Sequence, residues 1–412
     1  MIEKVCFKNW RSYEEAELPV DSLSVIIGAN ASGKSNALDG IEFLHHAALG
    51  RDLTSIFRGE AGGRKGLRGG LEWAAKRPEK VFALGVIVRE KSSGERYEYQ
   101  VSVRTEEYRA LIEQESLTWL RKAGKKPSIL HTDTVEPETP SIAGVLYNEK
   151  SGKKQEFSRT TSILSQIQKQ AHRKEIADAV GAVVADLATI FVLDPIPSLM
   201  RDFSTLSETL ESTGSNLAGL IAAMPPDGKK KFETTLQRYV KDLPEKDIVK
   251  IFAERVGKLK TDALLYCEER WKVGAPPILV DSRGMSDGTL RFLAIITALM
   301  TRPERSLLII EEIDKGLHPS RSGILMKVLT TLSVERSIDI LVTTHNPAFL
   351  NACGPEMLPF IIIATRESES GASTLRLLED LKGLDKLMAT ADLGTLSEKG
   401  YLERALQREV GT

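Results

Sequence analysis

The order of apolar and polar positions along the 412-residue chain predicts an α/β fold. At the N-terminus, Ile2, Val5 and Phe7 are separated by polar residues, as on a strand that is buried on one face. The apolar run at 23–27 fits a central strand buried on both faces. After a loop with glycines, residues 37–49 show helical periodicity. The chain therefore opens with strands, a glycine-bearing loop and a helix.

The middle of the chain has a less regular pattern. Residues 81–88 and 96–104 read as two strands of a hairpin joined at KSSGE. Residues 105–157 are mixed and polar, and residues 158–271 are mainly helical with three proline-bearing breaks. We expect several short helices in this stretch rather than a long coiled coil.

Beyond Pro276 and Pro277 the alternation of strands and helices returns. It predicts strands at 307–310, 338–342 and 359–364, and helices at 289–300 and 321–333. The fold class is therefore α/β, with a mixed sheet, an antiparallel β part and an inserted, mainly helical part. We predict three segments: an N-terminal lobe at 1–104, an insertion at 105–275, which is mixed and then mainly helical, and a C-terminal lobe at 276–412.

Composition and charge narrow the class of protein. Hydrophobic residues make up 42% of the chain and charged residues 27%, which suffices for a packed core. Lys and Arg number 56 against 57 Asp and Glu, so a strongly basic nucleic-acid coat is excluded, while a local basic groove is not. Cys6, Cys267 and Cys353 lie far apart, which argues against a disulfide framework and a zinc site.

The same sequence carries no sign of a membrane or export segment. No apolar run reaches about 18 residues. The N-terminus also lacks the hydrophobic core of a signal peptide. We therefore expect a cytoplasmic protein that has no membrane partner.

The first candidate for chemistry is the run GANASGKS at 28–35, which matches the phosphate-binding pattern G-x-x-x-x-G-K-[ST] at every required position. Glycines let successive backbone N–H groups point into one cavity, where they bind phosphate oxygens at a helix N-terminus. Lys34 would reach the β and γ phosphates, and the hydroxyl of Ser35 would ligate Mg²⁺. The alternative is a glycine-rich turn with a solvated lysine, but the strand before the loop and the helix after it favour ATP binding.

Two further strands end in polar residues. The run LLIIEE at 307–312 places two carboxylates at a strand end, and adjacent strand residues point to opposite sides. We assign Glu311 to the Mg²⁺ sphere and Glu312 to activation of the hydrolytic water. The run TTHNP delivers His345, which could contact the γ-phosphate or the attacking water. An exposed acidic strand end and a structural histidine are the plain alternatives.

The fourth candidate is the run SRGMSDGT at 282–289, which leads straight into a helix. Ser286 and Gly288 at that helix start form a second terminus suited to anions, and Ser286 or Asp287 would also cap the helix. One nucleotide needs only one phosphate-binding loop. A second such terminus is therefore explained best if it binds the γ-phosphate of a nucleotide held by another copy of the chain.

Taken together, these residues resemble ATPases of the ABC type found in the RecF, SMC, Rad50 and OLD families. They look closest to the compact AAA family ATPase branch associated with bacterial anti-phage defence. The motifs that carry the resemblance are FKNWRS at 7–12, GANASGKSN at 28–36, MSDGT at 285–289, LLIIEEIDKGLHPS at 307–320 and TTHNPAFL at 343–350. They correspond to the N-terminal strand motif, Walker A, signature, Walker B with D-loop, and H-loop.

The resemblance implies an ABC-ATPase head that dimerises head to head around two ATP molecules with Mg²⁺. One subunit would bind each ATP through Asn30, Gly33, Lys34, Ser35 and Asn36, and the other through Ser286, Gly288 and Thr289. By the same analogy Arg11 would approach the phosphates, with a plain surface arginine as the alternative, and residues 314–318 would lie at the dimer seam.

Two departures from the family pattern affect these expectations. The signature reads MSDGT rather than LSGGQ, which is usual in this branch. The first Walker B acid is Glu311 rather than Asp, and its longer side chain could bind Mg²⁺ indirectly, so turnover is less secure than nucleotide binding. The glutamine that senses the γ-phosphate has no firm place; Gln166 and Gln168 are the candidates.

Three functions remain open. The leading one is an ATPase that dimerises on ATP, or forms a higher oligomer, and regulates a separately encoded effector, a nuclease or toxin, in anti-phage defence. The second is a RecF-like clamp that binds duplex DNA through basic stretches at 64–68 and 229–231. The third is a nucleotide-dependent scaffold with little turnover. The long coiled coil of SMC and Rad50 proteins is missing from the sequence. No acidic DxD cluster of a TOPRIM nuclease follows His345 either.

Overall fold

The computed structural model describes residues 1–59, 66–121, 127–133, 135–136, 138–147, 152–240, 248–270, 272, 274–367 and 369–410. The chain forms two compact units. Unit 1 comprises Met1–Ile190, Ile361–Leu381 and Ala405–Thr412, and unit 2 comprises Phe191–Phe360 and Lys382–Arg404. Arg64 and Lys65, which belong to a basic stretch proposed above, lie outside the described residues. The predicted division into three segments stays a prediction.

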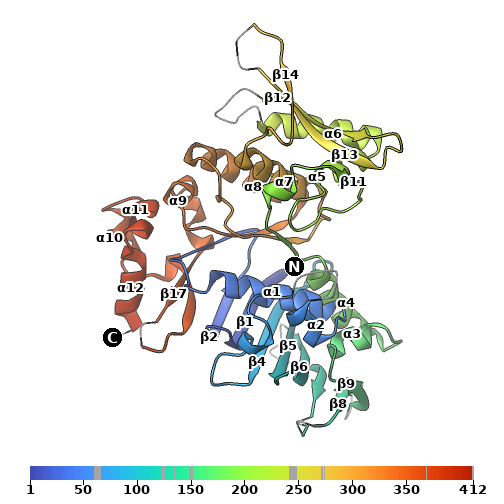
Figure 1. Ribbon diagram of the computed structural model, residues 1–412. Helices are drawn as coiled ribbons and strands as arrows, with labels where there is room; N and C mark the ends of the chain where they lie inside the picture. The colour runs from blue at the N-terminus through green and yellow to red at the C-terminus, as the bar shows by residue number, and fades with distance from the viewer. Residues whose placement is uncertain are drawn as a thin grey trace. The chain divides into compact units, whose positions relative to one another are not determined.

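Unit 1 is built on a sheet whose strands run in the order β3-β17-β18-β2-β1-β4-β5-β6-β7-β8-β9. Figure 1 labels most of these strands, among them β1, β2, β4 and β17. β17 is parallel to β3, and most of the other pairs are antiparallel. The strands are β1 Ile2–Trp10, β2 Tyr13–Pro19, β3 Leu23–Ile27, β4 Val81–Arg89, β5 Arg96–Thr105, β6 Ala110–Leu120, β7 Ser128–Thr132, β8 Ser141–Leu146, β9 Lys153–Ser158, β17 Ile361–Arg366 and β18 Ser373–Leu377.

The helices of unit 1 pack on this sheet. They are α1 Lys34–Ala48, α2 Leu53–Arg58, α3 Ile163–Gln168 and α4 Lys174–Ala188, with 3₁₀ turns η1 Leu71–Trp73 and η5 Leu378–Asp380. α1 contacts β1, and α4 contacts β4, β5 and β6. Trp10 of β1, Phe43 of α1, Phe57 of α2 and Phe82 of β4 form an aromatic cluster with ring centroids 4.8 to 6.4 Å apart. This core fixes α1 against the sheet and so places the loop that precedes it.

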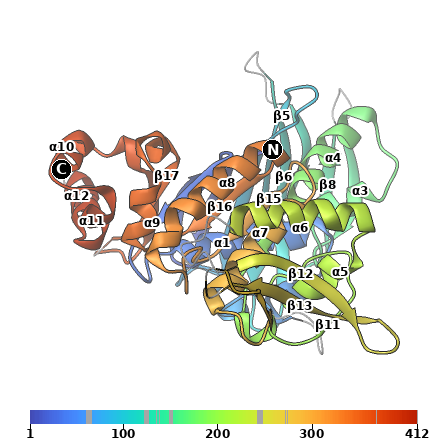
Figure 2. The ribbon, with the colours of Figure 1, turned by 90° about the horizontal axis from the view of Figure 1, so that it is seen from above.

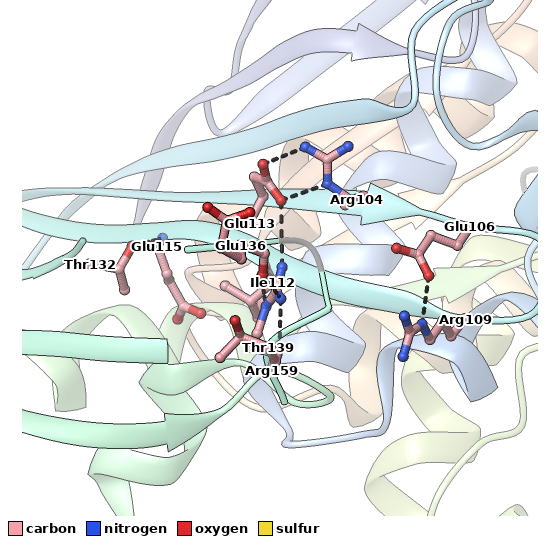
Figure 3. Close-up of polar contacts among 10 residues, drawn as sticks. All are labelled: Arg104, Glu106, Arg109, Ile112, Glu113, Glu115, Thr132, Glu136, Thr139 and Arg159. Carbon is pink, nitrogen blue, oxygen red and sulfur yellow. Dashed lines mark hydrogen bonds and ion pairs between the residues drawn. The ribbon is translucent and has the colours of Figure 1, made fainter. Parts of the chain in front are cut away.

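A buried arginine, Arg159, stabilises the part of the unit 1 sheet around β6 and β8 (Figure 3). The side chain of Arg159 is fully buried, and it donates to the carbonyl oxygens of Ile112 and Thr139, each at 2.7 Å. Its Nη2 lies 3.5 Å from the carboxylate of Glu113, which also accepts two hydrogen bonds from Arg104. Burial lowers the pKa of Arg159, and Glu113 opposes that shift. The residue therefore joins β6 to the segment that precedes β8.

Unit 2 contains a parallel three-stranded sheet in the order β10-β15-β16. Its strands are β10 Phe191–Leu193, β15 Leu307–Ile310 and β16 Asp339–Thr343. The helices α7 Asp287–Thr301 and α8 Ser322–Arg336 contact each other, and α8 contacts β16. This unit also has the helices α9 Pro347–Ala352, α10 Leu384–Met388 and α11 Leu393–Glu398, with 3₁₀ turns η2 Pro197–Leu199, η3 Pro319–Arg321 and η4 Pro355–Phe360. The C-terminal helix α12 spans Tyr401–Val410.

A second, antiparallel sheet of unit 2 replaces part of the helical stretch that the sequence pattern predicts. Its strands are β11 Ser204–Thr205, β12 Ile248–Val256, β13 Asp262–Glu269 and β14 Ile278–Asp281. The helices α5 Leu217–Ala223 and α6 Pro226–Val240 pack on β12 (Figure 2). The prediction of helix was wrong for residues 248–269. There Ile251 and Ala253 are buried while Lys250 and Glu254 are exposed, which is the alternation of a strand.

Most other predicted elements are present with small shifts of their ends. The strands predicted at 307–310 and 338–342 are β15 and β16, and the predicted hairpin is β4–β5. The strand predicted from 359 begins at Ile361, because Pro359 and Phe360 belong to the turn η4. In the described ranges, none of the helices has the length and apolar character needed to cross a bilayer.

Candidate functional site

The loop between β3 and α1 has two glycines that no other residue could replace without strain. Gly28 has φ +144°, and a Cβ there would lie 2.2 Å from the carbonyl oxygen of Ala364 on β17. Gly33 has φ +112°, and its Cβ would lie 2.6 Å from Oγ of Ser373 on β18. Both backbone conformations are ones that L side chains rarely adopt. The neighbouring strands therefore explain the glycine spacing of the loop.

The start of α1 has no side-chain cap of its own. Gly33 is the N-cap, and glycine has no side chain that could accept from the first amides of the helix. The first turn reads KSNA, so its only charge is positive. Nζ of Lys34 donates to the carbonyl oxygens of Gly28 (2.7 Å) and Ala29 (2.9 Å). The loop therefore curls around the lysine ammonium, while Asn30 at its tip is exposed.

Residues of the N-terminal strands hold this helix start in place. The hydroxyl of Tyr13 donates to the carbonyl oxygen of Gly33 at 2.9 Å, and burial raises the pKa of that hydroxyl. Nδ2 of Asn36 donates to Oγ of Ser12 at 2.7 Å, and Nε1 of Trp10 donates to the carbonyl oxygen of Asn36 at 2.7 Å. The Asn36 amide thus contacts the protein itself at the base of the predicted site.

Two arginines and one aspartate lie beside the first turns of α1. Nη1 of Arg11 is 2.8 Å from Oδ2 of Asp39, and Nη2 of Arg68 is 2.8 Å from Oδ1. Arg68 also donates to the carbonyl oxygen of Ser35 at 3.2 Å. Burial raises the pKa of the Asp39 carboxyl, and the two arginines oppose that shift. Burial also lowers the pKa of Arg11, against the effect of Asp39. Arg11 therefore contacts Asp39 here.

Asp39 and Arg68 were missed as site residues by sequence reasoning. Asp39 sits on the helix among buried positions, and Arg68 was considered only as part of a basic stretch. The one available signal was an acid on the apolar side of the helix, where a buried charge requires a partner. Neither partner is within 25 positions of Asp39 in the sequence, so the pairing depends on the folded structure.

In unit 2 the acidic pair follows β15. The strand ends at Ile310, and Glu311 and Glu312 lie in a turn beyond it, so the prediction that they are strand residues on opposite faces was wrong. Glu312 has φ +47°, an uncommon conformation for a residue with a side chain. Its N–H donates to Oγ1 of Thr343 at 2.9 Å, and its carboxylate lies 3.3 Å from Nζ of Lys315. The turn therefore gives the two acids different surroundings.

The end of β16 lies next to this turn because β15 and β16 are parallel neighbours. Oγ1 of Thr344 donates to Oδ1 of Asp314 at 2.5 Å and accepts from the N–H of Asn346 at 3.0 Å. Asn346 in turn caps α9. His345, between these two anchored residues, is exposed. The sheet edge of unit 2 thus brings together the Walker B and H-loop motifs.

The start of α7 carries the signature motif. Ser286 is the N-cap: its Oγ accepts from the N–H of Thr289 at 3.1 Å and lies 2.9 Å from the Thr289 hydroxyl. A Cβ on Gly288 would lie 2.7 Å from the carbonyl oxygen of Gly316, and Nη2 of Arg321 donates to Thr289 Oγ1 at 3.4 Å. The predicted D-loop therefore packs on the signature helix of the same chain, and it leaves Ser286 exposed.

The structure groups the predicted site residues within each unit. Unit 1 brings together Arg11, Asn30, Gly33, Lys34, Ser35 and Asn36, and unit 2 holds Ser286, Gly288, Thr289, Glu311, Glu312 and His345. Of the two candidate glutamines, Gln166 bonds through its amide to the backbone of Ser158 and Thr161, and Gln168 is exposed. The roles given to all these residues stay predictions.

Comparison with solved structures places the fold. A structure titled "Crystal structure of the SmcHead bound to the C-winged helix domain of ScpA" matches with a TM-score of 0.50 and 15% identity, covering 92% of this chain and 99% of that one. An SMC head domain from Thermotoga maritima matches with a TM-score of 0.42 and 12% identity over 91% and 98%. An Smc head with an extended coiled coil from Pyrococcus furiosus, bound to the C-terminal domain of ScpA, matches at 0.49 and 14% over 94% and 99%.

These observations define a class of protein. A phosphate-loop motif lies between a strand and a helix on a mixed sheet with the fold of an SMC head, and together with the family match at 23–351 this places the chain among the ABC-type ATPases of the SMC, RecF and Rad50 group. More narrowly, residues 23–351 match the family described as "AAA domain, putative AbiEii toxin, Type IV TA system", and the chain belongs to that family. No curated protein matches the sequence.

Proposed function

We propose that the protein binds and hydrolyses ATP, dimerises around it, and thereby regulates a separately encoded effector in anti-phage defence. The observation that carries the proposal is that the chain has two long helices, α1 and α7, whose first turns suit phosphate. The α1 start follows the glycine loop, and the α7 start presents the exposed Ser286. Since one ATP needs one phosphate loop, the second terminus is explained by a nucleotide that another subunit holds.

The residues of unit 1 fit a nucleoside triphosphate with Mg²⁺. The start of α1 and the ammonium of Lys34 would hold the phosphates, and the hydroxyl of Ser35 would ligate the ion. Among the described residues, no group of three or more His, Cys, Asp or Glu could hold a metal by itself. This suits Mg²⁺, which uses one or two protein ligands together with phosphate oxygens and water. When bound, it would neutralise charge that develops on the phosphates.

Hydrolysis would depend on the polar sheet edge of unit 2. Glu312 would orient and deprotonate the attacking water, and His345 would sense the γ-phosphate. The left-handed backbone conformation of Glu312 and the hydrogen bond from its N–H to Thr343 fix the backbone position from which this side chain extends. Nζ of Lys315 lies 3.3 Å from this carboxylate and partly offsets its negative charge.

The role in defence rests on the family. Its description names a toxin of a toxin–antitoxin system. The SMC head with the TM-score of 0.50 is bound, by its title, to a domain of a second protein. A head that changes between monomer and dimer offers such a partner two states to distinguish. The effector of this chain would be a nuclease or toxin, encoded nearby.

The decisive experiment is the Glu312→Gln variant, which keeps the shape of the side chain and removes the base. ATP with Mg²⁺ should convert it from monomer to a stable dimer in analytical ultracentrifugation, while phosphate release falls roughly 100-fold. Glu335→Gln, at an exposed position of α8, is the matched control and should behave like the natural protein. Unchanged hydrolysis in Glu312→Gln would contradict the assignment. A purified protein that binds ATP without releasing phosphate, with or without partner, would support the scaffold instead.

One feature of the surface favours the DNA clamp as the second candidate. Lys230 and Lys231 are exposed at the start of α6, where Lys229 donates to the carbonyl oxygen of Ala253 on β12. The tip of the β12–β13 hairpin adds the exposed Lys258 and Lys260. Salt-sensitive, ATP-dependent binding of duplex DNA that is lost in a Lys258→Glu, Lys260→Glu variant would support the clamp. Absence of such binding would favour effector regulation.

A further inference from the structure

Arg201 makes a dense set of contacts with the turn that precedes α7. Its Nη1 donates to three backbone carbonyl oxygens, those of Ser282 (3.2 Å), Arg283 (2.9 Å) and Met285 (2.7 Å). Its Nη2 lies 2.5 Å from Oδ1 of Asp287. In return, Oγ of Ser282 donates to the carbonyl oxygen of Arg201 at 2.8 Å. A residue more than 80 positions away thus fixes the shape of this turn.

The chemistry of these contacts suits a positioning role. Three carbonyl oxygens that point at one nitrogen would repel one another without a cation between them. Hydrogen bonds from a charged guanidinium are shorter and stronger than those between neutral groups, and the planar fork of arginine limits the directions they can take. Arg201 therefore holds the turn in the curvature that leads into Ser286, the cap of α7.

Arg201 is itself held in place on both sides. The preceding residue, Met200, is buried, and a Cβ on Gly214 would lie 3.2 Å from its sulfur. The following strand β11 pairs with β13, and Oγ of Ser204 accepts from the N–H of Gly219 at 2.8 Å. The guanidinium consequently reaches the turn from a fixed backbone, as a positioning residue must.

The ion pair of Arg201 with Asp287 offsets a negative charge at the start of α7. Asp287 is the first residue of α7, and its side chain is 65% exposed at the terminus that should meet a triphosphate. An unpaired carboxylate there would repel the phosphates and offset the favourable field of the helix. Arg201 pairs with it, and its own side chain is 28% exposed. The pair leaves the helix terminus without a net negative charge.

We propose that Arg201 is the positioning residue of the signature motif: it shapes the turn at 282–287 and neutralises Asp287, so that the start of α7 can bind the phosphates of ATP held by a second copy. This inference rests on the proposed function. It predicts that loss of Arg201 weakens dimerisation and leaves the binding of ATP to one subunit intact, because the glycine loop belongs to unit 1.

The test uses the full chain with Glu312→Gln as the parent, since that variant should hold the ATP-bound dimer. Adding Arg201→Ala should leave the affinity of the monomer for a fluorescent ATP analogue within twofold and weaken ATP-dependent dimerisation at least tenfold. Arg201→Lys, which keeps the charge, should lose less. Raising the protein concentration should restore dimer and phosphate release in the Arg201→Ala variant of the natural chain, as mass action requires.

The control is Arg283→Ala. That side chain leaves the same turn to pair with Asp281, at 2.5 Å, so its removal should not change dimerisation. Adding Asp287→Asn to Arg201→Ala should recover part of the lost dimerisation, because it removes the unpaired negative charge. We expect this partial recovery even if the loss of Arg201 also loosens the turn. Equal dimerisation with and without Arg201, or equal loss in Arg283→Ala, would overturn the inference. A parent that stays monomeric with ATP would instead contradict the proposed function.

Discussion

The starts of α1 and α7 solve the same physical problem in opposite ways. α1 begins at a glycine with no side-chain cap, and its first turn carries the cation Lys34. α7 begins at Ser286, whose hydroxyl oxygen accepts a hydrogen bond from an N–H of the first turn. The same turn carries the acid Asp287, which forms an ion pair with Arg201. The first helix start has no side-chain cap and carries a positive charge. The second is stable by itself and presents a hydroxyl and a compensated charge.

The start of α3 is a third case, in which a carboxyl group of the protein accepts hydrogen bonds from the first amides of the helix. At α3 the carboxylate of Glu115 accepts from the N–H groups of Ile163 (2.8 Å) and Leu164 (2.7 Å), and from the hydroxyl of Tyr99 at 3.0 Å. Glu115 is fully buried on β6, where its N–H donates to Thr132 (Figure 3). The protein thus satisfies one helix start with its own carboxyl group. The start of α1 differs from it, because its N-cap is a glycine and the charge in its first turn is positive.

The largest effect is expected at the start of α1, where the loss of Lys34 should weaken ATP binding. Lys34→Ala should weaken ATP binding roughly 1000-fold, about 4 kcal/mol, because it removes the cation from the loop. Isothermal titration with ATP and Mg²⁺ measures this loss. Lys76→Ala, which removes a surface ion pair with Glu14, is the control and should bind ATP normally. Near-normal binding by Lys34→Ala would mean that the start of α1 is not the phosphate site.

The next prediction concerns the filled terminus at α3. Burial raises the pKa of Glu115 to about 7, and the amide hydrogen bonds only partly offset this. The folded state therefore holds a proton that the unfolded state loses near pH 4.5, so this contribution to stability is complete below that pH and is lost as the pH rises to about 7. The loss is on the order of 3 kcal/mol.

Urea unfolding at pH 5 and pH 8 measures that difference. In Glu115→Gln, whose amide does not titrate, the decrease in unfolding free energy between the two pH values should be smaller by that amount. An equal decrease in the variant and the natural protein would show that Glu115 is not the titrating group.

A smaller effect is expected at the capped terminus. Gly288→Ala would place a methyl group 2.7 Å from the carbonyl oxygen of Gly316 and should displace the signature turn. ATP turnover should fall roughly 30-fold through weaker dimerisation, with ATP binding unchanged. Gly323→Ala is the matched control, since nothing lies within 4 Å of its added methyl group. If ATP binding by Gly288→Ala falls as far as turnover, the two termini do not have the separate tasks given to them here.

The smallest effect is expected from Arg68, which lies beside the first turns of α1. Its side chain is 51% exposed, and when Arg68 is removed, Arg11 still pairs with Asp39. Arg68→Ala should therefore raise the KM for ATP roughly threefold and leave kcat unchanged. Steady-state phosphate release gives both values. A larger loss than that of Lys34→Ala would make Arg68 a direct ligand of the nucleotide.

The sequence predicted the parts of the site that are local. The run 23–35 contains the strand, the turn and the start of the helix, and Nζ of Lys34 donates five and six residues back, to Ala29 and Gly28. The strands β15 and β16 were also readable, because each is a short apolar run. Residues 248–269 were misread as helical because their alternation is interrupted by charged residues that both helices and strands tolerate on an exposed face.

By itself, the sequence determined which segments carry chemistry, since glycine spacing and periodicity act over a few residues. Only the tertiary structure decided how these segments are held: Asp39 between two arginines, Glu115 under α3, and Arg201 at the turn before α7. The physical reason is that a buried charge or an open carbonyl needs some partner but does not specify which. Packing of distant strands and helices selects that partner, and no short pattern along the chain encodes the choice.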